Sequence, residues 1–378
     1  MNPHERHEIV WHTLYPLVHP WLTRKFNLTH EDLHVEGPVL LIPNHTCAWD
    51  PLLVAMSLPD KYVYYVASEH LFRMGPVSRL INWLVEPIPR RKASTGTDTV
   101  KACLRHLREG HSICLFAEGE QCWAGVNSPI FPATGKLAKT SGATLVTYRL
   151  EGGYLSLPRW GKGVRRGKVH GHPVGIYPPE QLRTMTPQEI NELIIRDTRE
   201  DAWLRQRREP VAFRGKNTAE GLEYALYLCP RCKRIGTIQT RNDRVFCRCG
   251  LDLRYTEYGF FEPEMPFRSI ADWDDWQRKT LKSRDFARAE KDRLFSDPAM
   301  RLTRVTAGHR DELLERGELI QYEDRIVCGT YSFALKNISN MADVLANRLL
   351  FTCNGKYYQL RSENGVNFRK YLEIWRNR

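Results

Sequence analysis

Between Gly37 and Gly153, short apolar runs alternate with stretches patterned as helices. Each run ends in turn residues, and this alternation is typical of a mostly parallel or mixed sheet covered by helices. The sequence therefore predicts an α/β fold, in which sites gather just beyond the strand ends. The four apolar runs are Val39 to Ile42, Tyr62 to Ala67, Ser112 to Phe116 and Ala143 to Leu150.

Residues 8–26, before this region, have the pattern of one or two short amphipathic helices, which Pro16 and Pro20 should break or kink. Their aromatic residues, followed by Arg24 and Lys25, suit a bilayer interface. A helix packed on the protein's own core is an equal alternative.

The second half of the chain changes pattern several times. Residues 187–208 and 270–296 look helical, and from about residue 300 short alternating runs precede a terminal helix. The predicted strands cover 318–322, 324–327, 331–335, 348–353 and 356–360. We expect a division into residues 1–215, residues 216–262 and residues 263–378, the last being a helix plus a small β-rich unit that resembles a pleckstrin-homology-type barrel.

Composition narrows the choice of partners. The chain has 378 residues, 42% hydrophobic and 26% charged, which excludes global disorder. Lys plus Arg exceeds Asp plus Glu by 56 − 44 = +12, which favours anionic partners: nucleic acid, a phospholipid surface or a phosphorylated substrate.

No stretch approaches the roughly 18–20 apolar residues of a membrane span. The start of the chain has no apolar signal core, so secretion is not expected. We therefore expect the ten cysteines of the chain to be thiols or metal ligands rather than disulfides.

The first polar cluster follows the run Val39 to Ile42. The turn delivers His45, and Asp50 lies five positions further on, close enough to accept a hydrogen bond from one ring nitrogen. That contact would fix the tautomer and raise the basicity of the other nitrogen, which suits direct deprotonation of a hydroxyl. A structural helix cap with a surface histidine is the alternative.

A second cluster follows the run Ser112 to Phe116. Glu118 could orient a polyol or a cationic side chain, and Gly119 allows close approach of a ligand to the backbone. Between the two clusters, a short extended stretch ends in cations that include Arg90 and Arg91, which suit a phosphate.

These clusters stand in the order and rough spacing of a known family. Asn-His-x4-Asp, Ile-Pro-Arg-Arg, Phe-Ala-Glu-Gly and a Leu-Ala pair before an apolar strand follow one another over residues 35–155. This segment resembles the glycerophospholipid (lysophospholipid) acyltransferase family, of which the 1-acylglycerol-3-phosphate acyltransferases are members. The resemblance implies a glycerolipid acyltransferase-like α/β fold with a mixed sheet covered by helices.

The resemblance also implies residue roles. His45 would be the general base that deprotonates the acceptor hydroxyl, and Asp50 would hold that histidine. The hydroxyl would attack an acyl thioester, either acyl-CoA or acyl-ACP (acyl carrier protein). Arg90 or Arg91 would bind the acceptor phosphate, and Glu118 and Gly119 would belong to the same acceptor site.

One departure from the family pattern concerns the acceptor. The usual Phe-Pro-Glu-Gly-Thr-Arg reads Phe116-Ala117-Glu118-Gly119-Glu120-Gln121 here. Gln121 replaces the second phosphate-binding arginine, which weakens the case for lysophosphatidic acid. A lysophospholipid or a related phosphorylated or glycolipid acceptor is therefore expected.

A third cluster contains four cysteines, Cys229, Cys232, Cys247 and Cys249, in Cys-x-x-Cys and Cys-x-Cys-Gly turns. Four thiolates on two tight turns are the ligand set of structural zinc, and the segment, with a predicted hairpin that turns at Asn242, looks like a zinc ribbon. Unliganded cysteines or a redox pair are the alternative. The cations around them could contact nucleic acid, although a solvated or lipid-facing surface is the favoured interpretation.

The sequence thus predicts a zinc-containing acyltransferase, cytoplasmic and peripheral on the inner face of the membrane. Its partners would be a thioester donor, a lysophospholipid-type acceptor and an anionic membrane surface contacted partly by the cations between Arg159 and Lys168. Two alternatives remain: a zinc-ribbon nucleic-acid-binding protein, and a lipid-binding protein that keeps the scaffold without turnover.

Overall fold

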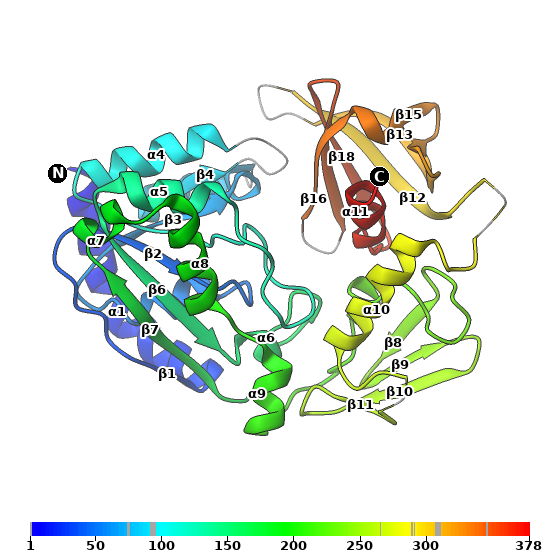
Figure 1. The fold of residues 1–378 in the computed structure, drawn as a ribbon, viewed down its shortest axis with the longest axis horizontal. Helices are drawn as coiled ribbons and strands as arrows, with labels where there is room; N and C mark the ends of the chain where they lie inside the picture. The colour runs from blue at the N-terminus through cyan, green and yellow to red at the C-terminus, as the bar shows by residue number, and fades with distance from the viewer. Residues whose placement is uncertain are drawn as a thin grey trace. The chain divides into compact units, whose positions relative to one another are not determined.

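The computed structural model describes residues 2–73, 76–90, 96–264, 266–288, 290, 292–306, 311–344 and 347–378. They form two compact units (Figure 1). The first contains nearly all described residues up to Gly215, and the second contains Trp160–Lys162 and the described residues from Lys216 onward.

The first unit is built on a seven-stranded mixed sheet (Figure 1). All neighbouring strands are parallel except β6 and β7, which are antiparallel. The predicted α/β class with a mixed sheet is therefore confirmed. In spatial order the strands are β1 (Leu28–His30), β7 (Val169–Tyr177), β6 (Thr144–Glu151), β2 (Val39–Pro43), β5 (Ser112–Cys114), β3 (Val63–Ser68) and β4 (Ile88–Arg90).

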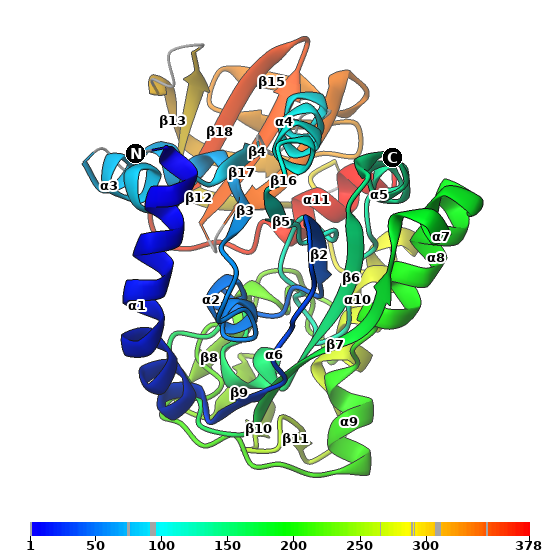
Figure 2. The same cartoon turned by 90° about the vertical axis from the view of Figure 1, so that its left-hand side faces the viewer.

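Helices cover both faces of this sheet, as Figure 2 shows with α1 on one side of the strands and α5, α7 and α8 on the other. Strand β2 explains the arrangement, because Val39 and Leu41 enter one core whereas Leu40 and Ile42 enter the other. The covering helices are α1 (Pro3–Phe26) and α2 (Asp50–Ala55) against the first core, and α4 (Thr97–Arg108), α5 (Ala133–Ser141), α7 (Pro179–Thr184) and α8 (Pro187–Thr198) against the second.

Short elements complete the unit. They are η1 (Glu69–Arg73), α3 (Pro76–Val85), α6 (Gly153–Ser156) and α9 (Ala202–Arg208). Two helices therefore occupy the charged segment 187–208, separated where Asp201 caps α9 by accepting from the backbone of Trp203.

Helix α1 differs from the expectation that its prolines would divide it. It is continuous over 24 residues, with Pro16 and Pro20 inside. Each proline removes one backbone donor, but tertiary contacts hold the helix: the Trp11 indole N–H donates to Leu58 O at 2.9 Å, and the Tyr15 hydroxyl donates to Met56 O at 2.9 Å. One face of α1 thus packs on the protein's own core.

The second unit contains two antiparallel sheets (Figure 1). A four-stranded sheet begins after η2 (Leu222–Tyr224) and consists of β8 (Ile238–Arg241), β9 (Arg244–Cys247), β10 (Leu251–Tyr255) and β11 (Phe261–Glu262). A seven-stranded sheet in the order β15-β14-β13-β12-β18-β17-β16 follows α10 (Ile270–Ser283), which is shorter than the predicted 270–296. Its strands are β12 (Phe295–Val305), β13 (Asp311–Gln321), β14 (Arg325–Cys328), β15 (Tyr331–Ala334), β16 (Ile338–Val344), β17 (Arg348–Cys353) and β18 (Lys356–Ser362), with η3 (Leu335–Asn337) after β15.

Helix α10 and the terminal helix α11 (Arg369–Arg376) tie these sheets into one unit. The Trp273 indole N–H on α10 donates to Leu228 O at 2.9 Å, just before the first cysteine pair. Asp274, also on α10, pairs with buried Arg369 on α11 at 2.7 Å. A charge pair buried this deeply needs both partners, because losing one would leave an uncompensated charge.

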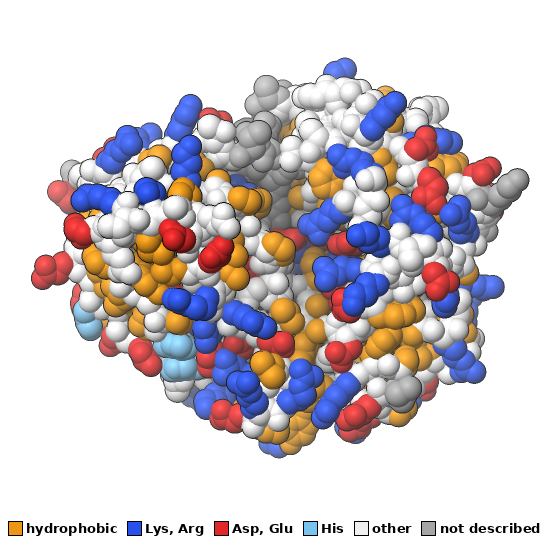
Figure 3. All heavy atoms as spheres, viewed as in Figure 1, with side chains coloured by type: hydrophobic (Ala, Val, Ile, Leu, Met, Phe, Trp, Pro, Cys, Tyr) orange, Lys and Arg blue, Asp and Glu red, His pale blue; other side chains and the backbone are white. Residues whose placement is uncertain are grey.

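Figure 3 shows one side of the molecule, where Lys and Arg side chains are interspersed with Asp and Glu side chains. Within the described residues, no helix is both long enough and apolar enough to cross a membrane.

Candidate functional site

The candidate site lies at one edge of the first sheet. Strand β2 has β5 and β6 as parallel neighbours, so the loops after these strands emerge at the same edge. Asn44, which is 1% exposed, joins two of these strand ends. Its side-chain amide donates to Leu150 O at 2.9 Å, and its Oδ1 accepts from Leu150 N–H at 2.7 Å.

The next residue, His45, is paired with Asp50. His45 Nδ1 lies 2.8 Å from Asp50 Oδ2. Because an ionised carboxylate can only accept, this contact places the imidazole proton on Nδ1 and leaves the lone pair of the neutral ring on Nε2. The ring is stacked on Phe116, with centroids 4.3 Å apart, and the side chain is 16% exposed. A base held in this way can reach a solvent-side hydroxyl.

The carboxylate of Asp50 is fully buried and fixed by its own turn. It accepts from the Thr46 backbone N–H, from the Thr46 hydroxyl at 2.8 Å and from the Cys47 backbone N–H at 2.9 Å. Asp50 also begins α2, where the partial positive charge of a helix N-terminus favours a carboxylate. Gly153 makes room for this turn, since a Cβ there would collide with Thr46 Oγ1.

Glu118, predicted to face a ligand, is instead 5% exposed and bonded to protein groups. Its Oε1 accepts from His45 N–H at 2.9 Å and from the Asn127 amide at 2.8 Å, while Oε2 accepts from Ser128 N–H at 2.6 Å. We therefore interpret Glu118 as a positioning residue for the His45 loop. Burial raises its pKa to about 7, although these hydrogen bonds oppose the shift.

Gly119 and Arg90 are linked through Phe131. Gly119 has φ +69°, and a Cβ there would collide with the Phe131 ring. The Arg90 guanidinium lies 4.0 Å from the centroid of the same ring. Among the described residues, no carboxylate pairs with Arg90, and burial lowers its pKa. A half-buried cation without an acidic partner suits an anionic ligand. Arg91 lies outside the described residues.

Arg159 contacts both Glu120 and Gln121, the two residues that depart from the family pattern. The Arg159 guanidinium pairs with Glu120 at 3.2 Å, donates to Gln121 O at 3.3 Å and stacks on Trp123 at 4.2 Å from its centroid. Arg159 is 6% exposed, so lipid headgroups cannot reach it. The expectation of a membrane-facing cationic segment is therefore wrong for Arg159, and also for Arg165, which is 4% exposed.

Two thiols near the dyad are poor nucleophiles. Cys47 and Cys122 are buried, and desolvation raises the pKa of each well above its usual value. Since the thiolate is the reactive form, these side chains stay protonated and do not compete with His45 chemistry.

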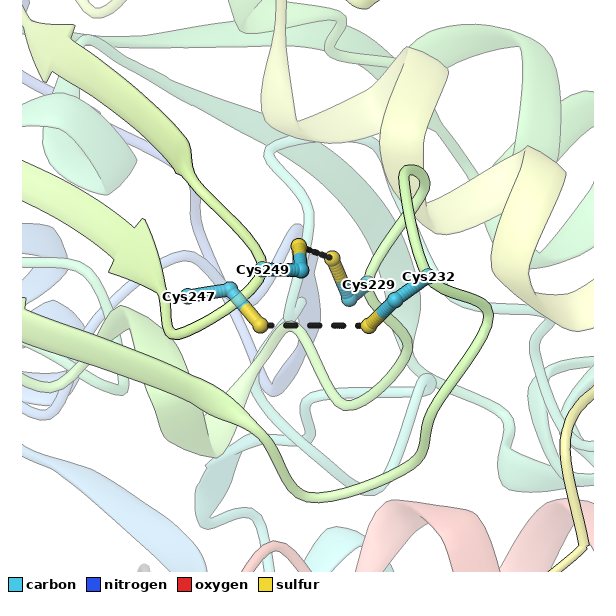
Figure 4. A group of neighbouring side chains, drawn as sticks. All are labelled: Cys229, Cys232, Cys247 and Cys249. Carbon is cyan, nitrogen blue, oxygen red and sulfur yellow. Dashed lines mark hydrogen bonds between the residues drawn. The ribbon is translucent and has the colours of Figure 1, made fainter.

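The four cysteines of the second unit meet at one point (Figure 4). Their sulfur atoms all lie within 4.8 Å of one another, with Cys229 Sγ 3.6 Å from Cys249 Sγ and Cys232 Sγ 3.9 Å from Cys247 Sγ. A tetrahedral zinc ion with Zn–S bonds of about 2.3 Å requires sulfur separations of about 3.8 Å. The donor set and spacing therefore fit such an ion. The hairpin β8–β9 carries Cys247, and its turn lies at Asn242, where the sequence predicts it.

Sequence reasoning missed several residues of the first site. Asn127, Ser128 and Phe131 lie in a loop of no regular pattern, and their contacts with Glu118 and Gly119 depend on the fold of that loop. In the sequence, Phe116 is recognisable only as the end of an apolar run, not as a ring beside His45. The one sequence signal for these contacts is that Asn127 and Ser128 are polar and follow Glu118 by about ten residues.

A known protein family matches the part of the chain that contains this site. The acyltransferase family model matches residues 25–151, which include the loops after β2 and β5. The chain is also similar to the crystal structure of the 1-acyl-sn-glycerophosphate (LPA) acyltransferase PlsC from Thermotoga maritima. In that match the sequences are 15% identical, the TM-score is 0.40, and the alignment covers 50% of this chain and 76% of that chain.

The raised pKa of Glu118 predicts a pH-dependent contribution to stability. Because the folded pKa of about 7 exceeds the usual 4.5, the folded state binds the proton more tightly between these values. The stabilisation of wild type relative to Glu118→Gln should therefore fall by about 3 kcal/mol as pH rises from about 4.5 to 7, and then level off. Urea unfolding across this range measures it, with the exposed Glu180→Gln as control. A difference that is flat with pH would contradict the assignment.

Proposed function

We propose that this chain, whose residues 25–151 form a domain of the acyltransferase family, transfers a fatty acyl group from a thioester to the hydroxyl of a lysophospholipid or related phosphorylated or glycolipid acceptor. The observation that carries the proposal is the 2.8 Å contact between His45 Nδ1 and the buried carboxylate of Asp50 at a parallel strand end.

The proposed mechanism is direct transfer. His45 Nε2 takes the proton of the acceptor hydroxyl, and the oxygen attacks the thioester carbonyl carbon to form a tetrahedral intermediate. When the intermediate collapses, the C–S bond breaks and the leaving thiolate of coenzyme A or acyl carrier protein receives the proton from His45. Asp50 holds the ring in the required tautomer and stabilises the transient imidazolium.

Arg90 is the proposed contact for the acceptor phosphate. Its guanidinium is held over Phe131 and has no acidic partner among the described residues, so it can offer a bidentate contact to a phosphate. Gly119 leaves room for the same ring, with which a Cβ would collide.

The four-cysteine cluster is proposed to hold structural zinc. Four protein ligands leave no open coordination position, so the ion would supply folding energy to the β8–β10 region and take no part in transfer.

Peripheral attachment to the inner face of a membrane is proposed through the apolar surface of α1 and α3, which contact each other. At about 100° per residue, Leu14, Leu17 and Trp21 fall within an arc of about 60° on α1, with exposed fractions of 39%, 69% and 49%. Helix α3 adds Leu80 and Trp83, which are 56% and 53% exposed. Exposed side chains of this size bordered by cations suit an anionic bilayer interface.

Substitutions at His45 and Arg90 test the dyad and the phosphate contact. His45→Ala should lower acyl transfer about 10²- to 10⁴-fold, the usual contribution of general-base catalysis. Arg90→Met should lower kcat/KM about 10- to 100-fold for a phosphorylated acceptor and leave an unphosphorylated one unchanged. Products formed from acyl-CoA, acyl carrier protein thioesters and a lysolipid panel are identified by mass spectrometry. Wild-type rates in His45→Ala would refute the dyad; His34→Ala, an exposed histidine, is the control.

Cys229→Ser and Cys247→Ser should each lose one zinc ion per chain, as measured by elemental analysis of purified protein. They should also lower the unfolding temperature, because metal-binding energy is folding energy in such sites. Cys353→Ala, a buried cysteine elsewhere in the same unit, should keep its zinc. Full metal content in the two serine variants would contradict the assignment of the four cysteines as zinc ligands.

Leu17→Glu combined with Leu80→Glu should abolish co-sedimentation with phosphatidylglycerol vesicles. Ile195→Glu, which changes a similarly exposed residue on α8, is the matched control and should bind as wild type does. Equal binding by all three proteins would rule out this surface.

A further inference from the structure

A second group of metal-type ligands lies in the first unit, at the end of α4. One imidazole nitrogen of His106, one of His111 and a carboxylate oxygen of Glu109 all lie within 4.8 Å of one another. The group shares no residue with the dyad or with the four cysteines.

The backbone holds these side chains together. His111 N–H donates to His106 O at 2.9 Å and Gly110 N–H donates to Leu107 O at 3.1 Å, the paired bonds of a Schellman motif. Gly110 supplies the left-handed conformation that the motif requires, with φ +87°. The chain therefore folds His111 back over the turn that carries His106, so the two imidazoles are brought together before any ligand binds.

Both imidazoles have a buried nitrogen that no protein group satisfies. Nδ1 of His106 and Nδ1 of His111 are inaccessible to solvent and have no hydrogen-bond partner. Glu109 Oε2 is 3.7 Å from His111 Nδ1, too far for a hydrogen bond but suited to sharing an ion. Buried polar atoms without partners are rare in folded proteins, and an ion bound through Nδ1 of each ring would satisfy both.

The position of the Glu109 carboxylate at the end of α4 also favours a bound cation. It is the C-cap residue of α4, where the partial negative charge of the helix end disfavours a carboxylate. A cation bound between Glu109 and the two histidines would be attracted by both the carboxylate and the helix end.

Neighbouring rings hold the ligands in orientation. The His4 ring packs against the His111 ring at a tilt of 33°, with centroids 4.0 Å apart. Its own nitrogens are engaged by the Tyr64 hydroxyl at 3.1 Å and by Glu8 at 3.3 Å. His4 thus fixes the plane of His111 without being free to bind the ion itself. Such support is typical of groups that surround metal ligands.

We propose that His106, Glu109 and His111 bind a divalent transition-metal ion such as Zn²⁺. Two imidazoles and one carboxylate are a common ligand set for zinc, and water would complete the coordination.

The test uses the full-length protein, freed of bound metal with a chelator and then given one equivalent of Zn²⁺ to fill the four-cysteine cluster. Calorimetric titration with Zn²⁺ should reveal one further equivalent in wild type. Glu109→Gln and His106→Gln should each weaken that equivalent at least tenfold. His34→Gln, an exposed histidine outside the group, should bind as wild type does. Cys229→Ser/Cys247→Ser should still bind at the histidine group, which separates the two sites.

The proposal is overturned if wild type binds no further equivalent, or if the equivalent survives in both Glu109→Gln and His106→Gln. Glu109 is half exposed, so its variant is expected to fold even if His106→Gln does not. Circular dichroism melting without added metal checks each variant.

Discussion

The buried carboxylate of Glu118 is the constraint on which the candidate site depends. It joins the His45 backbone, at the end of β2, to the loop that carries Asn127 and Ser128 beyond β5. With Asn44 tying the same loop to the end of β6, the histidine is held from both neighbouring strands. Because a general base must keep its geometry to be effective, these bonds to the backbone support the role proposed for His45.

The surroundings of the dyad restrict its chemistry. Asp50 is satisfied by donors from Thr46 and Cys47, so it holds the imidazole without needing a further partner. The nearby thiols are kept protonated by burial, which leaves no competing nucleophile of that kind beside the histidine. Arg90 provides a cation without an acidic partner among the described residues, whereas Arg159 is committed to Glu120. Gln121, which stands where the resembled family has an arginine, is contacted through its backbone oxygen by the same Arg159.

Local sequence patterns predicted most of the fold, because alternating apolar runs and turn residues specify strands, helices and turns through neighbouring residues alone. The mixed sheet and the β8–β9 hairpin follow from such patterns. The continuity of α1 through Pro16 and Pro20 could not be predicted, since it depends on contacts of Trp11 and Tyr15 with a distant loop. Strand β12 was missed for a similar reason: its pairing with both β13 and β18 is long-range. In the site, motif spacing indicated His45 and Asp50, but the inward orientation of Glu118 depends on partners in two other loops.

Two-substrate initial-rate kinetics test the central claim of direct transfer by the His45–Asp50 dyad most directly. Acyl transfer is measured while the thioester and the acceptor are varied against each other. Direct attack of the acceptor hydroxyl on the thioester requires both substrates to be bound together, so the double-reciprocal lines should intersect. Parallel lines, the pattern of a covalent acyl-enzyme intermediate, or an absence of transfer with every thioester and acceptor tested, would contradict the account.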